Sequence, residues 1–168
     1  MALAMAGCTP YHEEAGVRIP PAREASAAGR SHVVSAGERP VPAPSNGFVW
    51  PVEGRVIGLF GTRRMGGVNK GVDIQAPVGS EVRAARTGRV SFTSEGMPGF
   101  GKTIVIDHGD GYASVYAYVA QILVSRGENV QQRQVIARVG STGRTEVPAL
   151  HFEIRRHQRP RNPLHYLP

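Results

Sequence analysis

The pair of segments at residues 103–108 and 112–118 constrains the fold more than any other feature of the chain. Both are rich in β-branched and aromatic residues, and Gly109-Asp110-Gly111 separates them. An Asp-Gly step between two such runs is among the strongest short-range signals for a two-residue hairpin turn. The sequence therefore predicts an antiparallel hairpin here, and the rest of the fold has to be built around it.

Short apolar runs of the same kind recur along residues 48–168, separated by turn residues; the chain has 21 glycines and 13 prolines. No stretch shows the long 3.6-residue period of a helix. We expect an all-β domain of roughly eight short antiparallel strands, a sandwich or a partly open barrel. The other expected strands are 55–60, 71–74, the neighbouring pair 82–84 and 88–93, 134–139 and 148–154, and a mobile glycine-rich loop is expected at 95–101.

The segment Pro148–Ile154 alternates between apolar and polar side chains. As a strand, it directs Leu150, Phe152 and Ile154 to one face and Ala149, His151 and Glu153 to the other. We expect the first face to join the core. The second is predicted to be the open face, on which His151 marks a functional surface.

Length and charge narrow the classes of function. A chain of 168 residues supports one domain with a sizeable core. Residues 1–46 contain four Arg and four Glu, whereas residues 47–168 contain sixteen Lys and Arg against nine Asp and Glu. This basic excess favours an anionic partner, such as a cell-wall polymer, a membrane or an acidic protein, unless it is simply a solvated face. No nucleic-acid-binding motif is present, so nucleic acid is not expected as a partner.

The N-terminal part is predicted to be a tether. Residues 9–47 form a Pro/Ala-rich linker, expected to be disordered. The only cysteine is Cys8, so no intrachain disulfide is available. Residues 1–8 resemble the truncated end of a bacterial lipoprotein signal, which makes Cys8 a lipidation candidate. Residues 31–38 resemble the first strand of a LysM peptidoglycan-binding module without its remainder, and we interpret them as a relic.

Several landmarks in residues 48–168 follow one another in the order of one family. They are Trp50-Pro51-Val52, Lys70-Gly71-Val72-Asp73-Ile74, Ala76-Pro77-Val78-Gly79, Gly140-Ser141-Thr142-Gly143, Leu150-His151-Phe152-Glu153 and Asn162-Pro163. Together they resemble the LytM or lysostaphin-like peptidoglycan endopeptidase domain, which implies the fold of that family. The lipoprotein-like start and the closing segment 162–168 resemble its NlpD-type branch.

The resemblance implies that the site has degenerated. Active members bind zinc through a His-x-x-x-Asp motif and the second His of a His-x-His strand, and two further histidines assist the chemistry. The corresponding ligand positions are Asn69, Asp73 and His151, and the two assisting positions are Tyr118 and Ala149. An amide is a poor zinc donor, alanine transfers no proton, and a tyrosine is a weak base at neutral pH. We expect no enzyme, no catalytic residue, no metal and no cofactor.

Other histidines could in principle fill a vacated position. We expect instead that His108 is a structural residue at the hairpin and that His157 is exposed in a basic run; His165 lies close to the C-terminus. Asp73 and His151, the two remnant ligands, are predicted to hydrogen-bond to each other across the cleft.

The function implied by the resemblance is regulatory. We expect a domain in the periplasm or cell envelope, an outer-membrane lipoprotein if Cys8 is lipidated, that binds and activates a periplasmic N-acetylmuramyl-L-alanine amidase in cell-wall remodelling and cell separation. The predicted partner-binding cleft comprises Asn69, Asp73, Tyr118, Ala149 and His151, with Lys70 and Arg144 as nearby cations. The alternatives are a zinc-dependent peptidoglycan endopeptidase with altered ligands, in which zinc would be the cofactor, and a passive cell-wall-binding protein.

Overall fold

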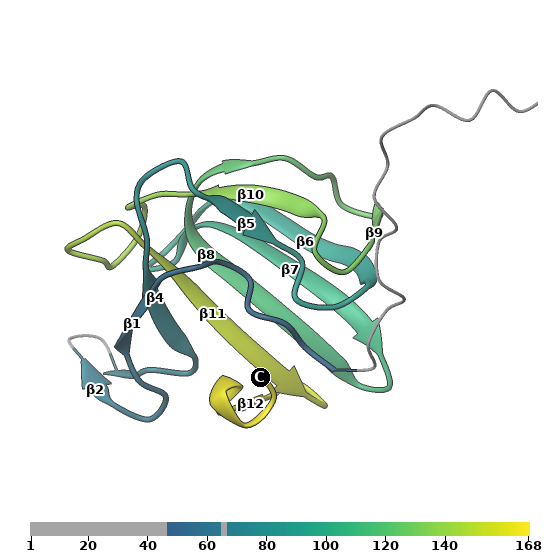
Figure 1. Cartoon of the computed structure of the whole chain (residues 1–168), viewed down its shortest axis with the longest axis horizontal. Helices are drawn as coiled ribbons and strands as arrows, with labels where there is room; N and C mark the ends of the chain where they lie inside the picture. The colour runs from purple at the N-terminus through teal and green to yellow at the C-terminus, as the bar shows by residue number, and fades with distance from the viewer. Residues whose placement is uncertain (1–46, 65–66) are drawn as a thin grey trace, which may run out of the picture. The chain divides into compact units, whose positions relative to one another are not determined.

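A computed structural model of the chain describes residues 47–64 and 67–168 (Figure 1). The predictions for the signal at 1–8, the lipidation candidate Cys8, the linker up to residue 46 and the LysM relic at 31–38 lie outside the described residues. In the described part, no helix has the length and apolar character needed to cross a membrane.

The described residues form an all-β structure, as the sequence predicts. The strands are β1 (Arg55–Gly58), β2 (Arg63–Arg64), β3 (Gly67–Val68), β4 (Val72–Gln75), β5 (Glu81–Arg83), β6 (Gly88–Met97), β7 (Gly101–Gly109), β8 (Tyr112–Ile122), β9 (Asn129–Val130), β10 (Val135–Val139), β11 (Ala149–Arg156) and β12 (Arg159–Arg161), and a single 3₁₀ turn, η1 (Pro163–His165), follows them.

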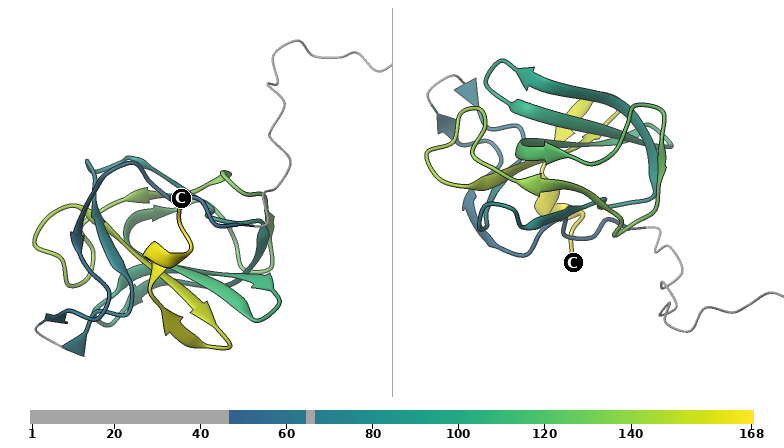
Figure 2. Two further views of the ribbon diagram at one scale, coloured as in Figure 1. Left: turned by 60° about the horizontal axis from the view of Figure 1, so that its bottom comes forward. Right: turned by 90° about the horizontal axis from the view of Figure 1, so that it is seen from above.

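The strands form one antiparallel sheet of ten strands and a small two-stranded sheet, β2–β3. The main path is β1-β4-β11-β8-β7-β6-β9, and the sheet does not close into a barrel. Strand β8 branches: Tyr112–Ala117 pair with β11, whereas Val119–Ile122 pair with β10, which in turn pairs with β5. The two views in Figure 2 show how β5 and β10 fold over the strongly curved central strands.

The hairpin that the sequence predicts is confirmed as β7–β8. Asp110 and Gly111 have φ angles of 52° and 75°, and both central residues of a type I′ turn require positive φ. The twist of this turn matches the right-handed twist of the two strands. The local chemistry of an Asp-Gly step therefore accounts for the centre of the sheet.

Two predictions about the next strands are wrong. Strand β6 continues to Met97 and β7 begins at Gly101, so the expected loop at 95–101 shrinks to residues 98–100. Register shifts between Ser94 and Met97 let the ladder continue through glycine-rich sequence, as β-bulges do. Segments 82–84 and 88–93 are also not sheet neighbours, because β5 pairs with β10 and β6 pairs with β7 and β9. Such long-range pairing is not written in the local pattern.

Strand β11 lies at the centre of the core. Leu150, Phe152 and Ile154 are fully buried and belong to the main apolar cluster, as predicted. The expected open face is wrong, however, because Ala149 and Glu153 are completely buried and His151 is only 4% exposed. Strands β4 and β8 flank β11 in the sheet, and the segments that line a cleft over these strands enclose this face.

Candidate functional site

A cleft of about 890 Å³ lies over the polar face of β4 and β11. Asn69, Asp73, His151 and Glu153 form its floor, and the segments 99–100 and 143–147 border it on the far side. The near rim carries Ile57 of β1 and Val68 of β3, two apolar side chains that are 37% and 54% exposed. The cleft therefore combines a polar floor with a partly apolar rim.

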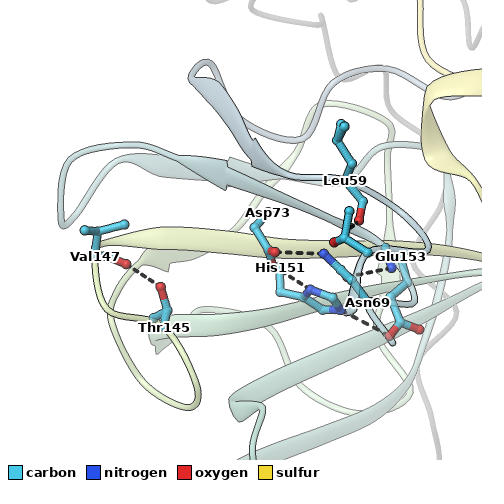
Figure 3. Close-up of polar contacts among 9 residues, drawn as sticks. Leu59, Asn69, Asp73, Thr145, Val147, His151 and Glu153 are labelled. Carbon is cyan, nitrogen blue, oxygen red and sulfur yellow. Dashed lines mark hydrogen bonds and ion pairs between the residues drawn. The ribbon is translucent and has the colours of Figure 1, made fainter. Parts of the chain in front are cut away.

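The floor begins with Asp73 on β4 and Asn69 on the preceding turn. The Asn69 Nδ2 group donates to Asp73 Oδ2 at 2.9 Å, and Asn69 Oδ1 accepts from the Gly71 backbone N–H at 3.0 Å (Figure 3). Because its oxygen is used by the backbone, the amide turns its donor side toward the carboxylate. Gly58 is required beside it, since a Cβ atom there would lie 2.0 Å from Asp73 Oδ2.

The network continues through His151 on β11, the residue opposite Asp73 in the sheet register. His151 Nδ1 lies 2.8 Å from Asp73 Oδ1, and His151 Nε2 lies 3.1 Å from Glu153 Oε1 (Figure 3). Both ring nitrogens face carboxylates, and this arrangement favours the doubly protonated ring, in which both nitrogens donate. The predicted hydrogen bond between Asp73 and His151 across the cleft is confirmed.

Glu153 connects this network to Arg155. Its Oε2 atom accepts from Arg155 Nε at 2.7 Å and lies 2.7 Å from a terminal guanidinium nitrogen. Two carboxylates, Asp73 and Glu153, are thus balanced by two cations, His151 and Arg155. Among the described side chains, no buried nitrogen or oxygen atom lacks a hydrogen-bond partner.

The electrostatics follow from these contacts. Burial alone lowers the pKa of His151, but the hydrogen bonds and charges of Asp73 and Glu153 outweigh burial, so the pKa is raised above its usual value. Burial alone raises the pKa of Glu153, but His151 and Arg155 outweigh it, so that pKa is lowered. The floor of the cleft is therefore a charged but internally neutralised network.

Two aromatic rings lie against His151. The Tyr118 and Phe100 ring centroids are 5.3 and 5.4 Å from that of the imidazole, within the range of aromatic pair contacts. Tyr118 has a φ of 67°, a costly conformation for a bulky residue, at the point where β8 changes partner from β11 to β10. A hydrogen bond from the Tyr118 N–H to the Phe100 carbonyl at 2.9 Å helps to hold it.

The structure brings six of the seven predicted cleft residues together. Asn69, Asp73, Tyr118 and His151 lie at the floor and wall, and Lys70 and Arg144 lie exposed at the rim. Ala149 is the exception: it is completely buried between β4 and a bridge to Gly140, and it does not line the cleft.

Sequence reasoning did not identify Glu153 or Phe100 as site residues. Glu153 carried a usable signal, because it lies two positions after His151 on the same strand face. Phe100 carried none, because it comes from a loop that reaches the cleft only through the tertiary fold.

The other histidines lie away from this cleft. His108 is held between the Thr87 carbonyl, 3.0 Å from Nδ1, and the Ser114 hydroxyl, 2.7 Å from Nε2. His157 and His165 are exposed, and none of the three lines the cleft. The structural role expected for His108 and the exposure expected for His157 are confirmed.

The floor does not offer the ligand set of a catalytic zinc ion, which needs three protein donors with free lone pairs. Asp73 and His151 are joined by a hydrogen bond, the other nitrogen of His151 is bound to Glu153, and Asn69 presents an NH₂ group. In the described part of the chain, no group of three His, Cys, Asp or Glu side chains is arranged to hold a metal. Of the three positions that correspond to zinc ligands, Asp73 and His151 carry ligand side chains and Asn69 carries an amide, which is a poor zinc donor.

Comparison with known proteins gives consistent relationships. The family model described as Peptidase family M23 matches residues 67–163. The chain is 43% identical over 136 residues to the "Lipoprotein NlpD/LppB homolog" of Pseudomonas aeruginosa, covering 80% of this chain and 45% of the relative. It is 42% identical over 125 residues to "Murein hydrolase activator NlpD" of Escherichia coli, covering 74% of this chain and 32% of the relative. The chain thus spans less than half the length of these relatives.

A solved structure described as a zinc-containing peptidase from Vibrio cholerae is also similar. The TM-score is 0.64 at 31% identity, and the match covers 69% of this chain and 39% of that one. The described residues therefore share their fold with a protein whose description includes zinc, although the floor of this cleft lacks a zinc ligand set.

Proposed function

The chain belongs to peptidase family M23, and on that premise we propose that it is a non-catalytic regulator of cell-wall hydrolysis that binds and activates a peptidoglycan amidase. One observation carries this proposal. The groups that correspond to zinc ligands satisfy each other, since Asp73 binds His151 and Asn69 binds Asp73. The frame of a peptide-binding cleft persists while its centre has no zinc ligand set.

The cleft has the composition of a protein-binding groove. Ile57, Val68 and Phe100 offer apolar contacts, whereas Lys70 and Arg144 offer cations at the rim. A segment of a partner protein that presents apolar side chains and a carboxylate would match both features. If the segment comes from an amidase that blocks its own active site, preferential binding of the released form shifts the enzyme toward activity.

Names of relatives support the same assignment. The Escherichia coli relative is named a murein hydrolase activator, and the Pseudomonas aeruginosa relative is named a lipoprotein. We accordingly place the protein in the periplasm or cell envelope, attached to the outer membrane if Cys8 is lipidated. Peptidoglycan and an N-acetylmuramyl-L-alanine amidase are the proposed partners, and no metal or other cofactor is required.

An amidase assay tests the proposal. The full chain is mixed with a purified periplasmic amidase and dye-labelled murein, and dye release is recorded against amidase alone and chain alone. We expect the chain to stimulate the amidase and to release nothing by itself. If the cognate amidases of the source organism show no stimulation, the activator function is wrong.

A matched pair of variants tests the role of the cleft. Phe100→Ala removes a half-buried ring from the cleft wall, whereas Phe92→Ala removes an exposed ring of β6 that does not line the cleft. We expect stimulation to fall about tenfold in Phe100→Ala, the effect of losing a contact of about 1.4 kcal/mol, and to be retained in Phe92→Ala. Equal stimulation by both variants would place the amidase contact elsewhere.

Metal analysis separates this proposal from the zinc endopeptidase. We expect the purified chain to hold no stoichiometric zinc, and Asn69→His to gain zinc affinity because it completes a three-ligand set with Asp73 and His151. Restoring histidine at 69, 118 and 149 together tests the full assignment through zinc content and muropeptide release. Stoichiometric zinc and muropeptide release in the unaltered chain would instead establish the endopeptidase.

A further inference from the structure

A second charged surface lies at the opposite end of β11 from the cleft. Arg86, Arg156, Arg159 and Arg161, here called the arginine face, gather near the tip of the β11–β12 hairpin. Arg156 lies five residues beyond His151, which separates the two by about 17 Å along a strand. The arginine face is thus distinct from the proposed amidase cleft.

The register of the β11–β12 hairpin places arginines directly opposite each other. Arg156 pairs directly with Arg159, and Arg161 pairs with Ile154, so that Arg156, Arg159 and Arg161 share one face of the hairpin. Like charges placed directly opposite in an antiparallel pair are destabilising. In the described residues, no ion pair to a carboxylate relieves Arg156, Arg159 or Arg161.

An aromatic ring concentrates the charge further. The guanidinium carbons of Arg86 and Arg156 lie 5.7 and 5.4 Å from the centroid of the Tyr112 ring. Arg86 has one acidic neighbour, the largely exposed Asp110 at 3.9 Å, and the nearby Asp107 carboxylate accepts the Gly109 N–H. Two cations are thus held around one ring, and the four arginines outnumber the two carboxylates.

The hairpin that presents these arginines is unusually constrained. Its two turn residues, His157 and Gln158, have φ angles of 48° and 63°, which such turns normally assign to Asn and Gly. The His157 N–H donates to the Gly111 carbonyl at 2.7 Å, and the ring lies so close to Gly111 that a Cβ there would be 2.4 Å from it. The tips of β7–β8 and β11–β12 therefore lock together, as the adjoining hairpins in Figure 2 show. Backbone strain of this kind persists where the surroundings hold it and is concentrated at functional sites.

We propose that the arginine face binds the peptide-stem carboxylates of peptidoglycan, so that the protein holds the polymer at one end of β11 and a partner protein at the other. A planar guanidinium matches a carboxylate through two parallel hydrogen bonds. An anionic membrane fits less well, because Leu164 is the single large apolar side chain in residues 154–168 that is counted as exposed, too little for interfacial insertion. The inference uses the cell-wall assignment of the proposed function but not the cleft.

Co-sedimentation of the full chain with isolated murein sacculi tests this inference. The variant Arg156→Gln/Arg159→Gln/Arg161→Gln is compared with Arg89→Gln/Arg126→Gln/Arg133→Gln, which removes three exposed arginines elsewhere. We expect the first triple variant to bind about tenfold more weakly and the control to bind like the unaltered chain. Circular dichroism and the unfolding midpoint confirm that each variant is folded.

Two further arms identify the ligand. Sacculi whose carboxyl groups have been amidated should lose the same binding, and vesicles of phosphatidylglycerol and phosphatidylethanolamine should bind the chain no better than neutral vesicles. Equal binding by both triple variants, undiminished binding to amidated sacculi, or binding to anionic vesicles in place of sacculi would overturn the inference. Stimulation of an amidase on soluble murein fragments should be unchanged in the arginine variant, so failure here is distinguishable from failure of the proposed function.

Discussion

Two histidines in this domain, the buried His151 and the half-buried His108, each make two hydrogen bonds, yet their pKa values are shifted in opposite directions. His151 lies in the cleft floor between two carboxylates, and its pKa is raised. His108 lies near the β7–β8 hairpin between a backbone carbonyl and a hydroxyl, and burial lowers its pKa to about 4. The comparison shows that the charge of the partners, rather than burial, decides which form of the ring the fold holds.

His108 belongs to a chain of hydrogen bonds that extends through Ser114 and Tyr116 to Ala85. The Ala85 N–H donates to the Tyr116 hydroxyl at 2.8 Å, and Tyr116 and Ser114 are joined at 2.9 Å. The Ser114 hydroxyl also lies 2.7 Å from His108 Nε2, and His108 Nδ1–H donates to the Thr87 carbonyl at 3.0 Å. None of these hydrogen-bond partners carries a charge that would stabilise a protonated His108 ring. The surroundings of His108 therefore favour a neutral ring, and those of His151 favour a protonated one.

The largest effect on stability is expected when the charged network around His151 is broken. Glu153→Gln leaves His151 and Arg155 without their shared anion in a buried site, which should lower the free energy of unfolding by about 3 kcal/mol or more. Urea unfolding at pH 7 measures it. Glu95→Gln is the matched control, because Glu95 pairs with Lys102 at an exposed site and should cost less than about 1 kcal/mol. Similar losses in both variants would mean that the network contributes nothing beyond a surface pair.

The second largest effect is expected at acidic pH, where His108 should lower the stability of the folded domain. The folded pKa of His108 is about 4 and its ordinary value is 6.5. Between these values the unfolded chain binds a proton that the folded chain refuses, so stability is full above pH 6.5 and falls as the pH drops toward 4, by about 3 kcal/mol. Unfolding free energies at pH 7 and pH 4.5 for the unaltered chain and His108→Gln isolate this contribution. An identical pH dependence in both proteins would contradict it.

A smaller loss of unfolding free energy is expected when one hydroxyl is removed from the hydrogen bonds around His108. Ser114→Ala removes the hydroxyl that bonds to both His108 and Tyr116, and it should cost about 1–3 kcal/mol at pH 7. Ser91→Ala provides the control, since that hydroxyl is exposed and bonds only to the Val105 carbonyl. Its cost should stay within about 0.5 kcal/mol. Urea unfolding of the two variants at one pH compares them directly.

The smallest expected effect is a change in how steeply the free energy of unfolding depends on pH above 6.5. The pKa of His151 is raised above 6.5, so its contribution to stability is complete below that pH and is lost as the pH rises through the folded pKa. His151→Gln should remove this slope, and NMR titration should show His151 and His108 on opposite sides of 6.5. A His151 resonance that titrates at or below 6.5 would end the contrast between the two sites.

Local sequence chemistry predicts the centre of this fold well. The Asp110-Gly111 turn and the alternation at Leu150, Phe152 and Ile154 each depend on neighbouring residues, and the structure confirms both. The resemblance to the LytM family implies that Asn69, Asp73 and His151 belong to one site, and the structure brings these three together. What a turn or a period-two pattern encodes can be recovered from a few residues.

The remaining features depend on contacts between distant segments. Pairing of β5 with β10, the continuation of β6 through Ser94 to Met97, and the burial of Ala149 follow from which strands meet. The same applies to Phe100, which reaches His151 from a loop, and to the two arginines that meet over Tyr112. Composition shows that the domain is basic, but only the register shows where the cations concentrate.

The branching of β8 has a consequence for how the cleft behaves in time. Its first half is bonded to β7 and β11 and its second half to β10, with β7 also reaching Val119, so it is flanked by partners along most of its length. Its backbone amides should be the slowest to exchange with deuterated solvent, opening only when the whole domain unfolds. Tyr118, in the middle of this strand, should therefore keep its orientation on every timescale shorter than unfolding. A partner segment has to adapt its own shape to that wall.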